Sequence, residues 1–145
     1  MDVTSETFLS ILKSALLGEK ANLNKDIYPE DWQKLFSMAS IHSVLPMFYE
    51  AVYASPSLQQ VNTPFVVMAK HQVMQQVMMQ TMRTNEFLEL NKRLHAAGVR
   101  PLVVKGIICR NLYPQPDYRQ SGDEDVLVLA ALVNKNWTHR NKKVK

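Results

Sequence analysis

The chain has 145 residues, of which 46% are hydrophobic and 21% charged, and this composition favours one compact domain over intrinsic disorder or a fibrous repeat. Its net charge of +4 suggests an anionic partner, but the excess lies at one end. Residues 135–145 carry five of the 17 basic residues and no acidic one, so residues 1–134 hold 12 basic against 13 acidic side chains. The folded part is therefore nearly neutral, and its charge does not point to a polyanion.

Cysteine content and hydropathy exclude further classes of protein. The single cysteine, Cys109, excludes an internal disulfide and a cysteine-rich zinc site. Residues 1–6 lack the basic start of a secretory signal, and no apolar run approaches the roughly 18 residues of a membrane helix. We therefore expect a soluble cytoplasmic protein with no membrane partner.

Apolar residues at helical spacing predict that the first two thirds of the chain are α-helical. Helices are expected over residues 4–18, from Pro29 to about Ala39, and over residues 41–53. The proline near the start of the second helix fits this boundary, because proline is tolerated in a first turn. The apolar stripe of that helix consists of Trp32, Leu35, Phe36 and Ala39.

A longer helix is expected over residues 65–97, because no proline or glycine interrupts this stretch before Gly98. Its methionines recur at helical spacing, which favours burial in the core. The alternative is an exposed, adaptable face through which the chain self-associates. The methionines concerned are Met68, Met74, Met78, Met79 and Met82.

In the last third of the chain the pattern becomes extended. The segment Leu102–Val104 predicts a short strand that ends at Lys105 and Gly106. Residues 107–113 favour a short helix, and residues 123–128 a second strand. The expected fold class is therefore α+β, with a mainly helical region followed by a strand, a helix and a strand.

Two carboxylates, Asp123 and Asp125, are the most informative side chains. Residues two apart in a strand project to the same face, where two carboxylates can hold a divalent cation through oxygen ligands. Taken alone, the pair also fits a solvated, polar entry to a strand after a glycine turn. Upstream, Gly106 stands between a strand and a helix, where a glycine lets a phosphate approach backbone N–H groups.

Several short motifs follow one another in this region: Lys105-Gly106, a short helical stretch, Tyr113-Pro114, Arg119, and Asp123-Glu124-Asp125 before Val-Leu-Val. In this order they resemble the signature of the bacterial uncharacterised nucleotidyltransferase family, a branch of the polymerase-beta-type nucleotidyltransferase superfamily. The resemblance is detailed over residues 104–128, and the helical region before it is similar in a less specific way.

The resemblance implies a nucleotidyltransferase that transfers a nucleotidyl group from an NTP to an acceptor of unspecified class. Asp123 and Asp125 would be the catalytic pair and would bind Mg²⁺ on the nucleotide. Lys105 and Gly106 match the strand-to-helix turn of the family and would face the phosphates. Arg119 matches the family's arginine, for which a phosphate contact and a structural ion pair with an acid are equal alternatives.

Two departures from the family's pattern bear on this hypothesis. Glu124 stands where the family has an apolar residue, and because an unpaired carboxylate facing a core is costly, we expect this position to be exposed. The family's fold also continues well beyond the aspartates and supplies a third carboxylate, whereas no Asp or Glu follows Asp125 here. We therefore expect a truncated, N-terminal part of the family's protein that is not catalytically competent by itself.

On this basis the chain divides into a helical region over residues 1–98, the start of the nucleotidyltransferase core over 99–130, and a basic, disordered tail over 131–145. The alternative function is a non-catalytic helical interaction module, or a remnant that needs a partner. The histidines lack the spacing of zinc ligands, and Cys109 is expected to be a small buried hydrophobe rather than a nucleophile.

Overall fold

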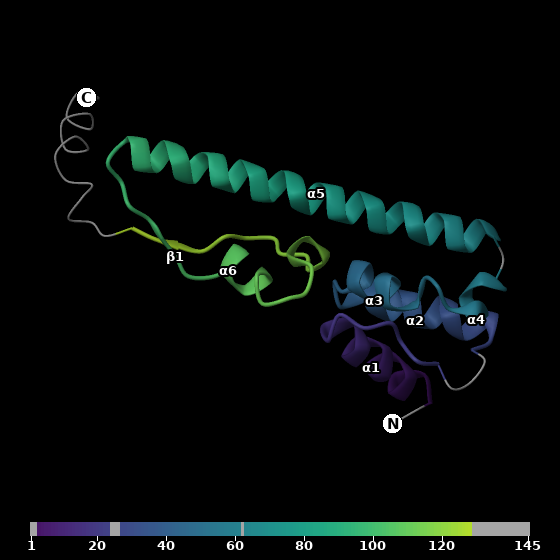
Figure 1. Cartoon of the computed structure of the whole chain (residues 1–145). Helices are drawn as coiled ribbons and strands as arrows, with labels where there is room; N and C mark the ends of the chain where they lie inside the picture. Colours follow the sequence, from purple (N-terminus) through teal and green to yellow (C-terminus); the bar gives the residue numbers. More distant parts are fainter. Residues whose placement is uncertain (1–2, 24–26, 62, 129–145) are drawn as a thin grey trace, which may run out of the picture.

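A computed structural model describes the chain over residues 3–23, 27–61 and 63–128 (Figure 1). The tail expected over residues 131–145 lies outside these ranges. Within the described ranges the chain is mostly helical and ends in a small two-stranded antiparallel sheet, which confirms the expected α+β class. No helix of these ranges combines the length and the hydropathy that a membrane span requires.

Four helices form the first part of the described chain: α1 (Val3–Leu16), α2 (Pro29–Ile41), α3 (Leu45–Val52) and the single turn α4 (Pro56–Gln59). The apolar stripe predicted for α2 is confirmed, because its buried residues are the ones that the helical spacing selected. The third helix is shorter than expected. It begins at Leu45, with a proline in its first turn, and the residue predicted to start it, Ile41, ends α2 instead.

An aromatic cluster forms the centre of this helical part. The ring of Phe36 lies 5.6 Å from that of Phe48 and 5.4 Å from that of Phe65, both edge to face. The Phe8 ring from α1 stacks on Phe48 at 5.5 Å, and Trp32 is fully buried beside Phe36. Offset and edge-to-face ring pairs add stability beyond the apolar area that they bury. The cluster therefore holds α1, α2, α3 and the start of the next helix together.

The long helix α5 (Thr63–Ala96) lies across the whole structure (Figure 1). Its N-terminal half covers the other helices, and its C-terminal half lies over the α/β segment. At 1.5 Å per residue, a helix of 34 residues is roughly 50 Å long, which is more than so small a core can cover.

The burial expected for α5 is wrong. Among its described side chains only Ala69, Val73 and Gln80 are buried, whereas the exposed methionines retain 50–65% of their surface. The buried residues lie along one narrow line of the helix, and the methionines lie on the opposite side, so the neighbouring elements do not reach them. These exposed residues are Met68, Met74, Met78, Met79 and Met82.

The α/β segment consists of β1 (Leu102–Val103), α6 (Ile107–Arg110), the 3₁₀ turn η1 (Pro116–Tyr118) and β2 (Val126–Leu127). The strands pair antiparallel, with Leu102 opposite Leu127 and Val103 opposite Val126. Both α6 and β2 are shorter than predicted, and the pair Asp123 and Asp125 precedes β2 instead of lying within it. The order of strand, helix and strand is confirmed.

Candidate functional site

The two aspartates meet a lysine where the paired strands end. The Lys105 Nζ lies 3.4 Å from Asp125 Oδ2 and 4.0 Å from Asp123 Oδ2. The pairing extends one bond past the strands, because the Val104 N–H donates to the carbonyl of Asp125 at 3.0 Å. All three charged side chains are open to solvent. The expected common face of the two carboxylates is therefore found, although the segment that carries them is not a regular strand.

Gly106 lets the two parts of this site approach each other. Its φ of +71° and ψ of −110° are unfavourable for residues with a Cβ. A Cβ at this position would lie 2.8 Å from the carbonyl oxygen of Asp123 and would also collide with the carboxylate of Glu124. The structure thus gives Gly106 a steric role at the loop of residues 119–125, which we call the aspartate loop.

Glu124 points inward and is paired, so the exposure expected for it is wrong. Its side chain is 17% exposed, and its Oε1 lies 2.9 Å from Nη2 of Arg110, which has no exposed surface. Its Oε2 accepts a hydrogen bond from the Ile107 N–H at 2.5 Å. The cost that we attached to a buried carboxylate is offset by a buried counter-charge. The signal that sequence reasoning missed is a basic residue, Arg110, in an otherwise apolar short helix.

The aspartate loop is also attached to α5. The Ser121 N–H donates to Oε1 of Gln80 at 3.0 Å, and Gln80 is 1% exposed. Just before the loop, the carboxylate of Asp117 accepts hydrogen bonds from Thr81 at 2.7 Å and from Thr84 at 3.2 Å. One side of α5 thus supports the chain that leads to Asp123, and none of these partners was identified from the sequence.

Arg119 faces a small pocket beside the aspartates. The pocket has a volume of about 220 Å³, and its lining includes Lys105, Gly106, Asp123 and the half-buried Cys109. The guanidinium of Arg119 lies 5.7 Å from the centre of the Tyr113 ring and donates to the neighbouring carbonyl of Gln120 at 3.2 Å. Within the described residues it forms no ion pair with an acid. The predicted site residues other than Asp125 thus line one pocket, with two cations on its walls.

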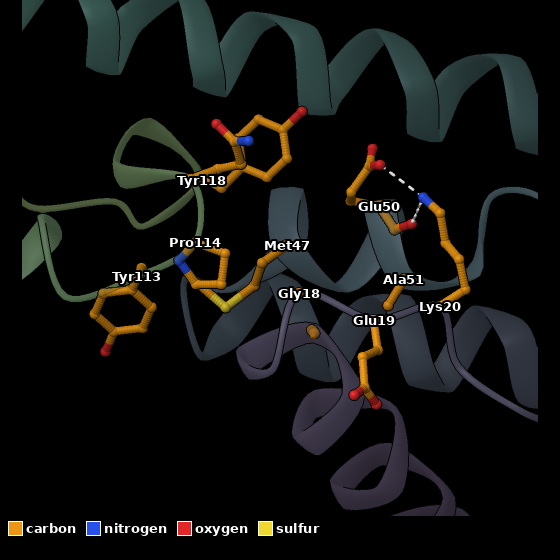
Figure 2. A pocket seen from close by; sticks show the side chains of 11 residues that line it. Gly18, Glu19, Lys20, Met47, Glu50, Ala51, Tyr113, Pro114 and Tyr118 are labelled. Carbon is orange, nitrogen blue, oxygen red and sulfur yellow. Dashed lines mark hydrogen bonds and ion pairs between the residues drawn. The ribbon is translucent and has the colours of Figure 1, made fainter.

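A second pocket, of about 200 Å³, separates the helical part from the α/β segment (Figure 2). Lys20 and Glu50 form an ion pair of 2.6 Å on one side of it, and Tyr113, Pro114 and Tyr118 stand opposite. None of the acidic or basic residues predicted for the site lines this pocket. Its one lysine is already paired with Glu50, and its remaining charged side chain is the carboxylate of Glu19, so the candidate site remains the pocket beside Asp123.

Potential metal ligands are few around the aspartates. Across the described parts of the chain, no group of three or more His, Cys, Asp and Glu side chains is arranged to hold a metal ion. Within these parts, therefore, Asp123 and Asp125 have no third protein carboxylate beside them that completes a site. A cation bound by this pair would take its remaining ligands from water or from a bound anion.

Comparison with known proteins bears on the identity of the chain. The model of a family described as "Uncharacterised nucleotidyltransferase" matches residues 28–135, a range that includes Lys105, Gly106, Arg119 and both aspartates. Searches of curated proteins and of solved structures gave no match. The family match covers most of the chain, from the start of α2 past the end of β2. The chain therefore belongs to the uncharacterised nucleotidyltransferase family.

Proposed function

We propose that the chain binds a nucleoside triphosphate together with Mg²⁺ at the aspartate loop and transfers its nucleotidyl group to an acceptor. The observation that supports this proposal is that Asp123 and Asp125 converge on one cation, the ammonium of Lys105, which lines a pocket together with Asp123. Two acids that approach the same positive charge can also share a divalent cation in its place. Membership of the family supports a nucleotidyltransferase-like reaction.

The chemistry of the aspartate pair fits Mg²⁺. This ion prefers oxygen ligands and is commonly held by one or two carboxylates together with substrate phosphates. Asp123 and Asp125 supply such carboxylates, and both remain open to solvent. When bound, Mg²⁺ neutralises charge on the phosphates and stabilises the leaving oxygen.

The phosphates of the nucleotide are assigned to the cations of the pocket. Lys105 and Arg119 line it, and within the described residues Arg119 has no carboxylate that neutralises it. A guanidinium and an ammonium bind phosphate oxygens well. The Ile107 N–H already donates to Glu124, so side chains carry these contacts rather than the first amide of α6. Gly106 contributes by letting the aspartate loop pack closely against the turn, because a Cβ there would collide with Glu124 and the carbonyl of Asp123.

The test is Mg²⁺-dependent binding of each of the four NTPs, measured by calorimetry. The variant Asp123→Asn/Asp125→Asn keeps the size of both side chains and removes their charges, and we expect it to lose binding at least tenfold. The matched control, Glu30→Gln/Glu86→Gln, removes two exposed carboxylates elsewhere and should bind like the wild type. Equal binding by the aspartate variant and the wild type would refute the proposal.

One observation favours a second candidate, a non-catalytic interaction module. The methionine side of α5 is exposed, and exposed apolar surfaces of this kind mark contacts with other proteins. The same titration separates the two functions, because an interaction module has no reason to bind an NTP in a manner that depends on both Mg²⁺ and the aspartates.

A further inference from the structure

Arg110 is the charged residue that the described part of the chain buries completely. It has 0% exposed surface and lies in α6, which is a single turn. Burying a guanidinium is costly unless all of its donors are paired. Among the described residues neither its Nε nor its Nη2 has a hydrogen-bond partner, although Nη2 lies within ion-pair distance of Glu124, so the compensation is incomplete. Stability alone is a weak reason for an arginine at this place, and its contacts point to a geometric role.

These contacts lie on both sides of Asp123. The Nη1 of Arg110 donates to Oγ of Ser121 at 2.9 Å, and its Nη2 lies 2.9 Å from Oε1 of Glu124. A single rigid guanidinium thus holds the aspartate loop before and after the residue that carries the candidate metal ligand. The planar, fixed spacing of its donors suits this task better than a flexible ammonium would.

Both held residues are fixed a second time. The N–H of Ser121 is bound to Gln80 of α5, and Oε2 of Glu124 is bound to the N–H of Ile107 at the start of α6. In extended chain, neighbouring side chains point to opposite sides. An inward Glu124 therefore directs its neighbours, Asp123 and Asp125, outward to the side on which Lys105 lies.

We propose that Arg110 is a positioning residue that, through Ser121 and Glu124, holds Asp123 and Asp125 in the orientation that binds the metal. This inference rests on the function proposed above and adds to it the group that sets the geometry of the aspartates. It also gives a reason for an acid between them. Glu124 is a residue through which the buried arginine holds the loop.

The test separates positioning from stability by comparing two variants. In Arg110→Met the carboxylate of Glu124 loses its counter-charge, so both the melting temperature and the affinity for Mg²⁺·ATP should fall. In Arg110→Met/Glu124→Met two apolar side chains replace the ion pair, and such replacements restore stability in buried sites. We expect the double variant to regain most of the melting temperature, while its affinity stays at least tenfold below that of the wild type.

Two controls accompany these variants. Arg93→Met makes the same substitution at an exposed site of α5 and should change neither quantity. Ser121→Ala removes a single contact of Arg110 and tests the inference if the arginine variants do not fold. Its affinity for Mg²⁺·ATP should fall twofold to fivefold. If the double variant regains affinity together with stability, or if Ser121→Ala binds like the wild type, Arg110 has no positioning role.

A measurement on the chain without ligand tests this inference separately from the proposed function. Hydrogen exchange of the amide of Ser121, whose acceptor Gln80 is kept in the double variant, should be at least tenfold faster there, while that of Leu35 in the core of α2 stays unchanged. Unchanged exchange at Ser121 would overturn the inference. Faster exchange in a chain whose wild type binds no NTP would instead confirm that Arg110 holds the loop and refute the function proposed for it.

Discussion

Replacing Gly106 by alanine tests how closely the aspartate loop approaches the turn after β1. The change adds one methyl group at a positive φ, in a place where it would lie 2.8 Å from the carbonyl oxygen of Asp123. A residue held in so sparsely populated a conformation costs about 1–3 kcal/mol. Forcing an extra carbon into a filled space costs about 1–3 kcal/mol more. We therefore expect Gly106→Ala to lower the free energy of unfolding by roughly 2–6 kcal/mol.

Gly98 provides the matched control. It has a φ of +79° and ends α5 in a Schellman motif, in which the Val99 N–H donates to the carbonyl of Leu94 at 2.9 Å. A Cβ there would meet no atom within 4 Å, so Gly98→Ala carries only the backbone cost of about 1–2 kcal/mol. The difference between the two variants combines the collision with the aspartate loop and the less common backbone conformation of Gly106.

The assay is thermal unfolding followed by circular dichroism. For a chain of this size 1 kcal/mol corresponds to about 3 °C in melting temperature. We therefore expect a fall of about 3–6 °C for Gly98→Ala and of about 6–18 °C for Gly106→Ala. Equal falls would show that the loop does not approach Gly106 as closely as described, and the steric account of the site would be wrong.

Three further outcomes are expected from named side chains. Lys105→Met removes the cation that pairs with the aspartates. Exposed ion pairs are worth up to about 1 kcal/mol, so calorimetry should find Mg²⁺ alone bound about twofold to fivefold more tightly. Mg²⁺·NTP should instead bind more weakly. Cys109 is the single cysteine and lines the pocket, so Mg²⁺·NTP should slow its alkylation by iodoacetamide, measured by mass spectrometry. Equal alkylation rates with and without Mg²⁺·NTP would argue against nucleotide in that pocket. Trp32→Ala should lower the free energy of unfolding, measured in urea, by about 3–5 kcal/mol. Leu112→Ala, at an 83% exposed site, should lower it by less than about 0.5 kcal/mol. Similar losses would contradict the core described for α2.

The helices were predictable where one local pattern decides them. Trp32 and its partners on α2 recur at the spacing that places them on one side, and α1, α3 and the start of α5 cover that side. For α5 the sequence pattern predicted the ends of the helix but not which of its side chains are buried. Apolar residues such as Met74 and Met78 form a second stripe on the side of the helix away from Ala69 and Val73, and only the tertiary arrangement decides which stripe is covered.

The acids of the site could be predicted from the sequence, but the residues that hold them in place could not. Asp123 and Asp125 could be placed on one face because alternation along extended chain is a local rule. The pairing of Glu124 with Arg110 joins residues from different elements, so no spacing in the sequence indicates it. A desolvation cost could therefore be assigned to Glu124 from the sequence, whereas the charge that offsets it could not be identified.

The helical part of the chain has a direct bearing on the candidate chemistry. The strands β1 and β2 pair over two residues each, and a two-stranded sheet is marginally stable by itself. What fixes the aspartate loop is therefore the set of side chains around it: Gln80 and the two threonines of α5 on one side, and Arg110 on the other. Because α5 is in turn fixed by packing against α3, we expect a perturbation of the aromatic core to reach the aspartates through this continuous helix. The helical region is in this sense part of the site, since the orientation of its acids depends on a scaffold that the short strands do not provide.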